Sequence, residues 1–86
     1  MREDRVDPRS AVEGALAAIW REVLELDSVG VHESFFELGG HSLLAARVIS
    51  RINDAFQTDL PLRSMFEHPS IAEMSITVSS VKAASA

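Results

Sequence analysis

The 86-residue chain contains no cysteine, and it carries fewer basic than acidic residues. Without cysteine it can form neither a disulfide framework nor a cysteine-ligated zinc site. Its 8 lysine and arginine residues stand against 13 aspartate and glutamate residues, which gives a formal charge of −5. Because the phosphates of nucleic acid need a basic surface, this balance argues against a nucleic-acid-binding protein.

Long apolar segments are absent as well. No apolar run approaches the length that spans a bilayer, and the charged start, Met1–Arg5, lacks the apolar centre of a signal peptide. We therefore expect a cytoplasmic protein without a membrane contact. The length suits one small domain, and an apolar fraction of 47% can build a thin core with a stability of about 5 kcal/mol.

The apolar residues recur at helical spacing and predict an all-α domain, a small bundle of three main helices and one short helix. The first helix is expected from Ala11 to Leu26, after a capping box formed by Ser10 and Glu13. The second helix is expected over 42–56, where the apolar residues again fall on one face.

The last third of the chain predicts two further helices. A short helix over 63–67 is stopped by Pro69, and Ser70 opens the last helix with a second capping box. Because Thr77 and Val78 are β-branched, we expect the end of the last helix to fray.

One core is expected where the inward faces of these helices meet. The residues expected in it are Leu16, Trp20, Val23, Val48, Ile52, Phe56, Phe66 and Ile71. In the long connection between the first two helices, Val29 and Val31 are expected to fill apolar gaps.

The composition divides the chain into three segments. Residues 1–9 are charged and are expected to be a linker or chain end, residues 10–79 the folded domain, and residues 80–86 a tail. The charged start and the alanine- and serine-rich end would fit a domain cut from a larger protein, but a free-standing protein stays an open alternative.

The long connection ends in Gly39 and Gly40, which give the backbone freedom that other residues lack. Ser42 therefore lies where a flexible loop becomes a helix. Serine is a favoured helix N-cap, which is one explanation for its presence. A helix N-terminus also suits a phosphate attached to that hydroxyl, because free N–H groups and the positive end of the helix dipole lie there.

The residues around Ser42 do not favour a hydrolase. The nucleophile elbow Gly-x-Ser-x-Gly requires glycine at position 44, which is Leu44. The adjacent His41 cannot face Ser42 on a helix. The histidines, His32, His41 and His68, show no helical metal-ligand spacing, so no metal site is expected.

The stretch Phe-Phe-Glu-Leu-Gly-Gly-His-Ser-Leu-Leu-Ala, from Phe35 to Ala45, resembles the signature of peptidyl carrier (thiolation) domains of nonribosomal peptide synthetases. The resemblance runs from about Val12 to Met74. It implies an acyl-carrier-like helical bundle with 4′-phosphopantetheine attached covalently to Ser42. Gly40 and His41, the residues just before the serine, would then belong to the cofactor site.

The resemblance also implies a function and a set of partners. A phosphopantetheinyl transferase would attach the arm from coenzyme A, and the arm would hold aminoacyl or peptidyl groups as thioesters. Adenylation, condensation and thioesterase or tailoring domains would then act on these groups. The chain itself would be a non-catalytic, monomeric carrier without a nucleic-acid or membrane partner.

A candidate contact surface for such partners lies beside the serine. Leu43 and Ala46 point away from the expected core of the second helix, and Arg47 lies one turn beyond Leu43. We expect these residues, together with Met65 of the short helix, to form a partner-binding patch. The alternative is that Leu43 only shields the loop and Met65 belongs to the core.

Other functions stay open at this point. Arginines on the outward face of the second helix favour a peptidyl carrier over a fatty-acid carrier, whose second helix is acidic. An acyl or aryl carrier of a polyketide or siderophore pathway is an alternative, as is an unmodified helical interaction module. A small enzyme is opposed by the missing base. The carried amino acid is chosen by adenylation domains, so this sequence does not name it.

Overall fold

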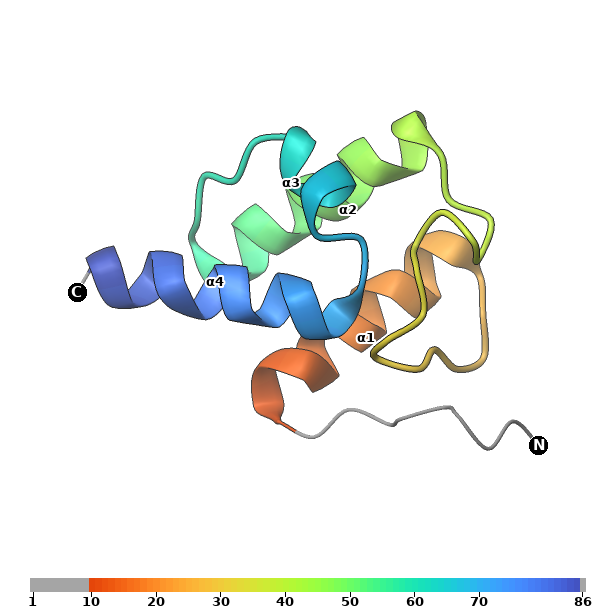
Figure 1. The fold of residues 1–86 in the computed structure, drawn as a ribbon, viewed down its shortest axis with the longest axis horizontal. Coiled ribbons are helices and arrows are strands. Elements are labelled where there is room, and N and C mark those ends of the chain that lie inside the picture. The colour runs from red at the N-terminus through yellow and green to blue at the C-terminus, as the bar shows by residue number, and fades with distance from the viewer. Residues whose placement is uncertain (1–9, 86) are drawn as a thin grey trace.

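The structure is a computed structural model that describes residues 10–85, with side chains to Val81. The described chain forms four helices and no strand, which confirms the all-α prediction (Figure 1). The helices are α1 (Ala11–Leu24), α2 (Ser42–Phe56), α3 (Arg63–Glu67) and α4 (Ile71–Ser85). The expected linker at 1–9 lies outside the described residues.

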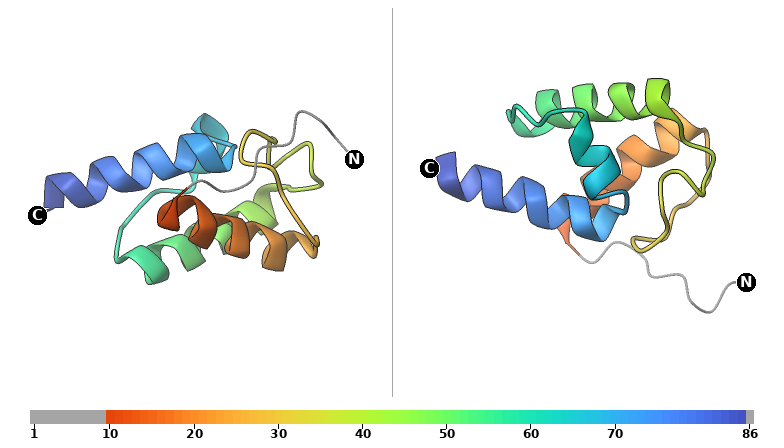
Figure 2. Two further views of the ribbon diagram at one scale, coloured as in Figure 1. Left: turned by 90° about the horizontal axis from the view of Figure 1, so that it is seen from below. Right: turned by 45° about the horizontal axis from the view of Figure 1, so that its top comes forward.

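Helix α1 packs against both α2 and α4, while the short α3 packs against α2. The right-hand view of Figure 2 shows α3 between α2 and the start of α4. The long connection from α1 to α2 folds over one end of the bundle (Figure 1). Two backbone hydrogen bonds hold it to the start of α4: Ala72 N–H donates to Val31 O (2.9 Å) and Phe35 N–H to Pro69 O (2.8 Å).

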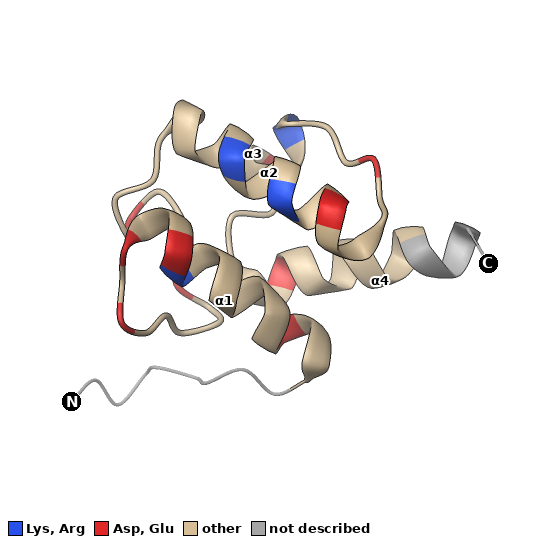
Figure 3. Cartoon of the chain, turned by 180° about the vertical axis from the view of Figure 1, so that it is seen from behind, with Lys and Arg blue, Asp and Glu red and all other residues tan. Residues whose placement is uncertain are grey.

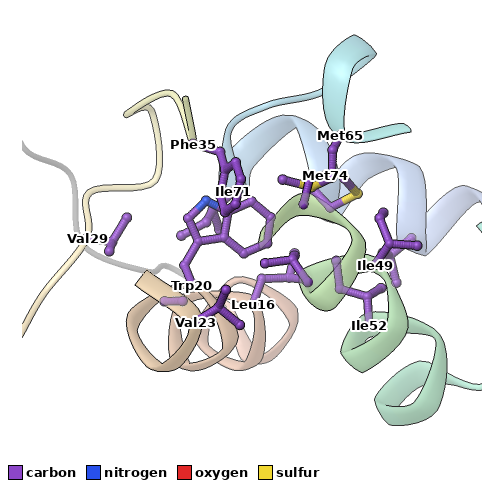
Figure 4. Packing of buried hydrophobic residues seen from close by; sticks show 14 of the residues in the cluster. Leu16, Trp20, Val23, Val29, Phe35, Ile49, Ile52, Met65, Ile71 and Met74 are labelled. Atoms are coloured by element: carbon purple, nitrogen blue, oxygen red, sulfur yellow. The ribbon is translucent and has the colours of Figure 1, made fainter. Parts of the chain in front are cut away.

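The core forms where α1, α2, α4 and the long connection meet. Trp20 and Ile52 are fully buried, as predicted, and so is Val31 of the connection. In Figure 4, Leu16 and Trp20 of α1 lie among Ile49, Ile52, Ile71 and Met74 of the facing helices. Phe56 is only partly buried and packs against the edge of this cluster.

Both predicted capping boxes close the helices they precede. Ser10 Oγ accepts a hydrogen bond from Glu13 N–H (3.1 Å), and Ser70 Oγ accepts one from Glu73 N–H (3.2 Å). The Ser70 hydroxyl also donates to the Glu73 carboxylate (2.9 Å). These bonds satisfy N–H groups that the first turn of a helix leaves without partners.

Two helix ends differ from the prediction. Helix α1 ends at Leu24, two residues early, because Glu25 adopts a left-handed conformation with φ 57°. Helix α4 does not fray at Thr77 but continues through Ser85. The Ser75 hydroxyl donates to the Ala72 carbonyl (2.9 Å), which lets a polar residue fit within the helix.

The α2–α3 connection is held by one amide side chain at the end of α2. Asn53 Nδ2 donates to Leu60 O (3.1 Å), and Asn53 Oδ1 accepts from Leu60 N–H (2.8 Å) and the Thr58 hydroxyl (2.7 Å). Gln57, in a left-handed conformation, ends α2 without a glycine. The hydrogen bonds of this side chain therefore fix the path that the chain takes from α2 to α3.

The orientation of α3 is the main correction to the predicted core. Met65 is fully buried, whereas Phe66, expected in the core, is 52% exposed. Figure 4 shows Met65 beside Met74 of α4. A flexible thioether fills the irregular gap between three helices more readily than a rigid ring does.

The buried Ile52 and the exposed Ile76 offer a matched test of the core. Ile52→Ala removes a side chain with 0% exposure and should lower the free energy of unfolding by about 2–5 kcal/mol. Ile76→Ala removes the same atoms from a residue 68% exposed and should change it by less than about 0.5 kcal/mol. Urea denaturation measures both, and equal values would contradict the described core.

Candidate attachment site at the start of α2

Ser42 is the first residue of α2, and its side chain is exposed. The preceding His41 is the N-cap residue, with an extended backbone, and no side chain caps this end of the helix. The explanation that Ser42 serves as the N-cap is therefore wrong. Its hydroxyl is available for modification at a position where the backbone is already helical.

The start of α2 suits a phosphate on that hydroxyl. The first intrahelical bond runs from Ala45 N–H to His41 O (2.8 Å), so the N–H groups of Ser42, Leu43 and Leu44 precede the hydrogen-bonded turns. The first turn contains no acidic residue that would repel an anion. The exposed oxygen, the free N–H groups and the helix dipole together fit a phosphodiester such as the one in 4′-phosphopantetheine.

The two glycines before His41 have different structural roles. Gly39 has φ 107°, a conformation that residues with a Cβ rarely adopt. Gly40 has an ordinary φ, but a Cβ there would lie 2.2 Å from Cε2 of Phe35. The Gly40 N–H also donates to Phe35 O (3.0 Å). The second glycine is thus required by contact with a core ring.

A chain of aromatic contacts connects this loop to the rest of the domain. Phe35 is fully buried and meets Trp20 edge to face, with ring centroids 5.7 Å apart. Phe35 also meets Phe36 edge to face (5.4 Å), and Phe36 stacks on Phe66 of α3 (5.1 Å). The loop before Ser42 is therefore supported by α1 on one side and by α3 on the other.

The expected partner-binding residues are only partly brought together. Leu43 is 67% exposed, and Ala46 and Arg47 are exposed on α2. Met65 is fully buried and does not belong to this surface, so that prediction is wrong. Helix α3 is too short for its apolar pattern to show which face is buried, because five residues make little more than one turn.

Sequence reasoning missed the apolar groups that α3 does expose. Leu62, the N-cap of α3, is 41% exposed, and Phe66 is 52% exposed. The sequence feature that could have indicated the orientation of α3 is the turn at Pro61. In the structure, Ser64 N–H donates a hydrogen bond to Pro61 O and Met65 N–H donates one to Leu62 O, and these bonds fix the rotation of the helix.

Neither a metal site nor a membrane-spanning helix is found in the described part of the chain. No group of three or more histidine, aspartate or glutamate side chains is placed to hold a metal ion there. In the same part of the chain, none of the helices combines the length and apolar character needed to cross a bilayer.

The model of the family described as a phosphopantetheine attachment site matches residues 14–78. The solution structure of PCP, a prototype for the peptidyl carrier domains of modular peptide synthetases, superposes with a TM-score of 0.78 at 39% identity. The similarity covers 86% of this chain and 97% of that chain. This chain belongs to the peptidyl carrier domain family. Carrier domains of this family bind 4′-phosphopantetheine covalently, and the arm comes from coenzyme A.

Two further relatives show the context of such carriers. A chain in the structure of the phosphopantetheine transferase Sfp in complex with coenzyme A and a peptidyl carrier protein has a TM-score of 0.84 at 37% identity, covering 87% of this chain and 97% of that chain. Tyrocidine synthase 3 of Brevibacillus parabrevis is 49% identical over 77 residues, 90% of this chain. The carrier domain spans only 1% of the length of that synthase.

Gly40→Ala and Gly14→Ala test the contact that supports the loop. An added Cβ at Gly40 would overlap the buried Phe35 ring, so we expect a loss of about 1–3 kcal/mol in the free energy of unfolding. A Cβ at Gly14, inside α1, meets nothing within 4 Å and should stabilise the domain by about 0.5–1 kcal/mol. Thermal melting compares them; a Gly40→Ala domain as stable as wild type would refute the contact.

Proposed function

We propose that this carrier domain holds aminoacyl or peptidyl groups as thioesters during nonribosomal peptide synthesis, on a 4′-phosphopantetheine arm attached to Ser42. The observation that carries the proposal is the exposed, uncapped Ser42 at the first position of α2, preceded by the Gly-Gly-His sequence. The similarity to tyrocidine synthase 3 and to a carrier domain of modular peptide synthetases supports the peptidyl type over a polyketide or fatty-acid carrier.

The chain itself contributes by presenting the Ser42 hydroxyl, and later the loaded arm, to partner enzymes. When a transferase attaches the arm, the Ser42 hydroxyl loses its proton and its oxygen bonds to phosphorus, while the phosphoanhydride bond of coenzyme A breaks and adenosine 3′,5′-bisphosphate leaves. The arm supplies the thiol that holds the acyl group, which the cysteine-free chain cannot provide. Leu44 and Ala45 anchor the first turn of α2 to the core, so the attachment point stays in one place while the arm moves.

We further propose that the domain catalyses no reaction of its own. His41 is exposed and has an extended backbone just before the helix, and none of the hydrogen bonds described for residues 10–81 joins its ring to Ser42. Chemistry would come from partners: the transferase first, then adenylation, condensation and thioesterase or tailoring domains. A monomeric, cytoplasmic carrier domain that begins near residue 10 completes this proposal. Its last helix runs beyond the limit expected at residue 79, because α4 continues to Ser85 and Val81 packs against the core.

Ser42→Ala tests the attachment site, with Ser50→Ala as its control. Both serines are exposed on α2, so both variants should fold with little loss of stability. After incubation with coenzyme A and a phosphopantetheinyl transferase, intact-protein mass spectrometry should show the arm on wild type and Ser50→Ala but not on Ser42→Ala. An unmodified wild-type protein would favour the helical interaction module instead.

We also propose that partners contact the apolar groups exposed around the attachment site. This surface, the docking patch, consists of Leu43 on α2 with Leu62 and Phe66 of the α3 region, and Ala46 extends it along α2. Phe66 takes the place that had been expected for Met65. Burying an exposed leucine completely is favourable by about 1.5–3 kcal/mol, which suits contacts that must form and break repeatedly.

Leu43→Ala tests the docking patch, with Ile76→Ala on α4 as the control. The two side chains are 67% and 68% exposed, so both variants should keep the wild-type melting temperature. We expect Leu43→Ala to lower kcat/KM for phosphopantetheinylation about tenfold, equivalent to about 1.4 kcal/mol, and Ile76→Ala to leave it unchanged. Equal rates for both folded variants would remove Leu43 from the patch.

A further inference from the structure

The positive charges of this acidic protein are unevenly distributed. The side chains described include four arginines, of which Arg47 and Arg51 lie on α2 and Arg63 begins α3. Figure 3 shows these cationic positions on α2 and at the start of α3 in one view. Acidic positions lie at the end of α1 and in the connection that follows it, and also near the end of α2 and in the loop after it. The helix that carries Ser42 is thus locally basic in a chain with a formal charge of −5.

The arginines of this face are not equivalent. Arg51 forms an ion pair with Glu22 of α1, which largely cancels its charge toward an approaching molecule. Neither Arg47 nor Arg63 forms an ion pair with a carboxylate in the described part of the chain, and both are exposed. Two guanidinium groups therefore remain uncompensated on the two elements that also expose the docking patch.

Arg47 and Arg63, which form no ion pair within the described residues, lie close in sequence to exposed apolar residues. Arg47 lies one helical turn beyond Leu43, and Arg63 directly follows Leu62 in sequence. On each of the two elements a positive charge therefore lies next to an exposed apolar residue, which is complementary to a partner surface that combines apolar groups with negative charge. The net negative charge of the rest of the domain would repel the same partner from any other face.

We propose that the docking patch, flanked by Arg47 and Arg63, is recognised by partner enzymes that present carboxylates around an apolar contact. This inference rests on the carrier function proposed above. Charge complementarity of this kind raises the rate of encounter and fixes orientation more than it raises affinity. A carrier that meets several enzymes in turn needs fast arrival and fast release, which this arrangement supplies.

Arg47→Gln and Arg51→Gln form the matched test. Both replace an exposed arginine of α2 by a neutral residue and change the net charge equally, but only Arg47 is free of an ion pair. The probe is the phosphopantetheinyl transferase Sfp with coenzyme A at low salt. We expect Arg47→Gln to lower kcat/KM about fivefold with kcat unchanged, and Arg51→Gln to stay within about twofold.

Two extensions show whether the effect is electrostatic. Adding Arg63→Gln to Arg47→Gln should lower kcat/KM about fivefold further. In about 0.5 M NaCl the differences among all variants should fall below about twofold, because the screening length is then only about 4 Å. Equal losses for Arg47→Gln and Arg51→Gln would overturn the proposal, because net charge and not the free guanidinium would then control encounter. No loss in Arg47→Gln would overturn it as well.

Coenzyme A carries phosphates, which could attract the same arginines. Binding of Ser42→Ala carriers to the transferase without coenzyme A, measured by calorimetry, separates the two sources of negative charge. The proposal requires Arg47→Gln to weaken this binding, and an effect seen only with coenzyme A present would overturn it. Failure of the carrier function looks different: the wild-type domain would then gain no mass at Ser42.

Discussion

The contact between the Gly40 backbone and the ring of Phe35 is the constraint on which the functional end of the domain depends. Phe35 packs against Trp20 in the core, and its backbone N–H donates a hydrogen bond to the carbonyl oxygen of Pro69, just before α4. The chain can pass this ring only where it has no Cβ. One fully buried side chain therefore determines where the loop turns into α2 and where Ser42 emerges.

The same ring connects the attachment site to the surface of α3. Phe36 contacts Phe35 on one side and stacks on the half-exposed Phe66 on the other. Aromatic pairs of this geometry are each worth about 0.5–1.5 kcal/mol beyond the area they bury. Ring contacts thus connect the loop before Ser42 to the exposed Phe66 of α3, although Ser42 and Phe66 lie 24 positions apart in the sequence.

The sequence was sufficient where a pattern was long and local. Apolar periodicity over fifteen residues located α2 correctly from Ser42 to Phe56, and the two serine–glutamate capping boxes marked the starts of α1 and α4. It was insufficient for α3, whose five residues offer both Met65 and Phe66 to the core. Nor could the structural role of Gly40 be predicted, because it depends on a ring in an aperiodic loop that itself depends on α1.

Asn53 and Ser42 make the length of α2 important for the direction of the arm. The amide of Asn53 fixes the path toward α3 at one end of the helix, while Ser42 begins the other end eleven residues earlier. Each residue of an α-helix adds about 1.5 Å and about 100° of rotation. A single insertion between them would turn the arm away from α3 by more than a quarter of a circle. The length of α2 between Ser42 and Asn53 therefore sets the direction of the arm relative to α3.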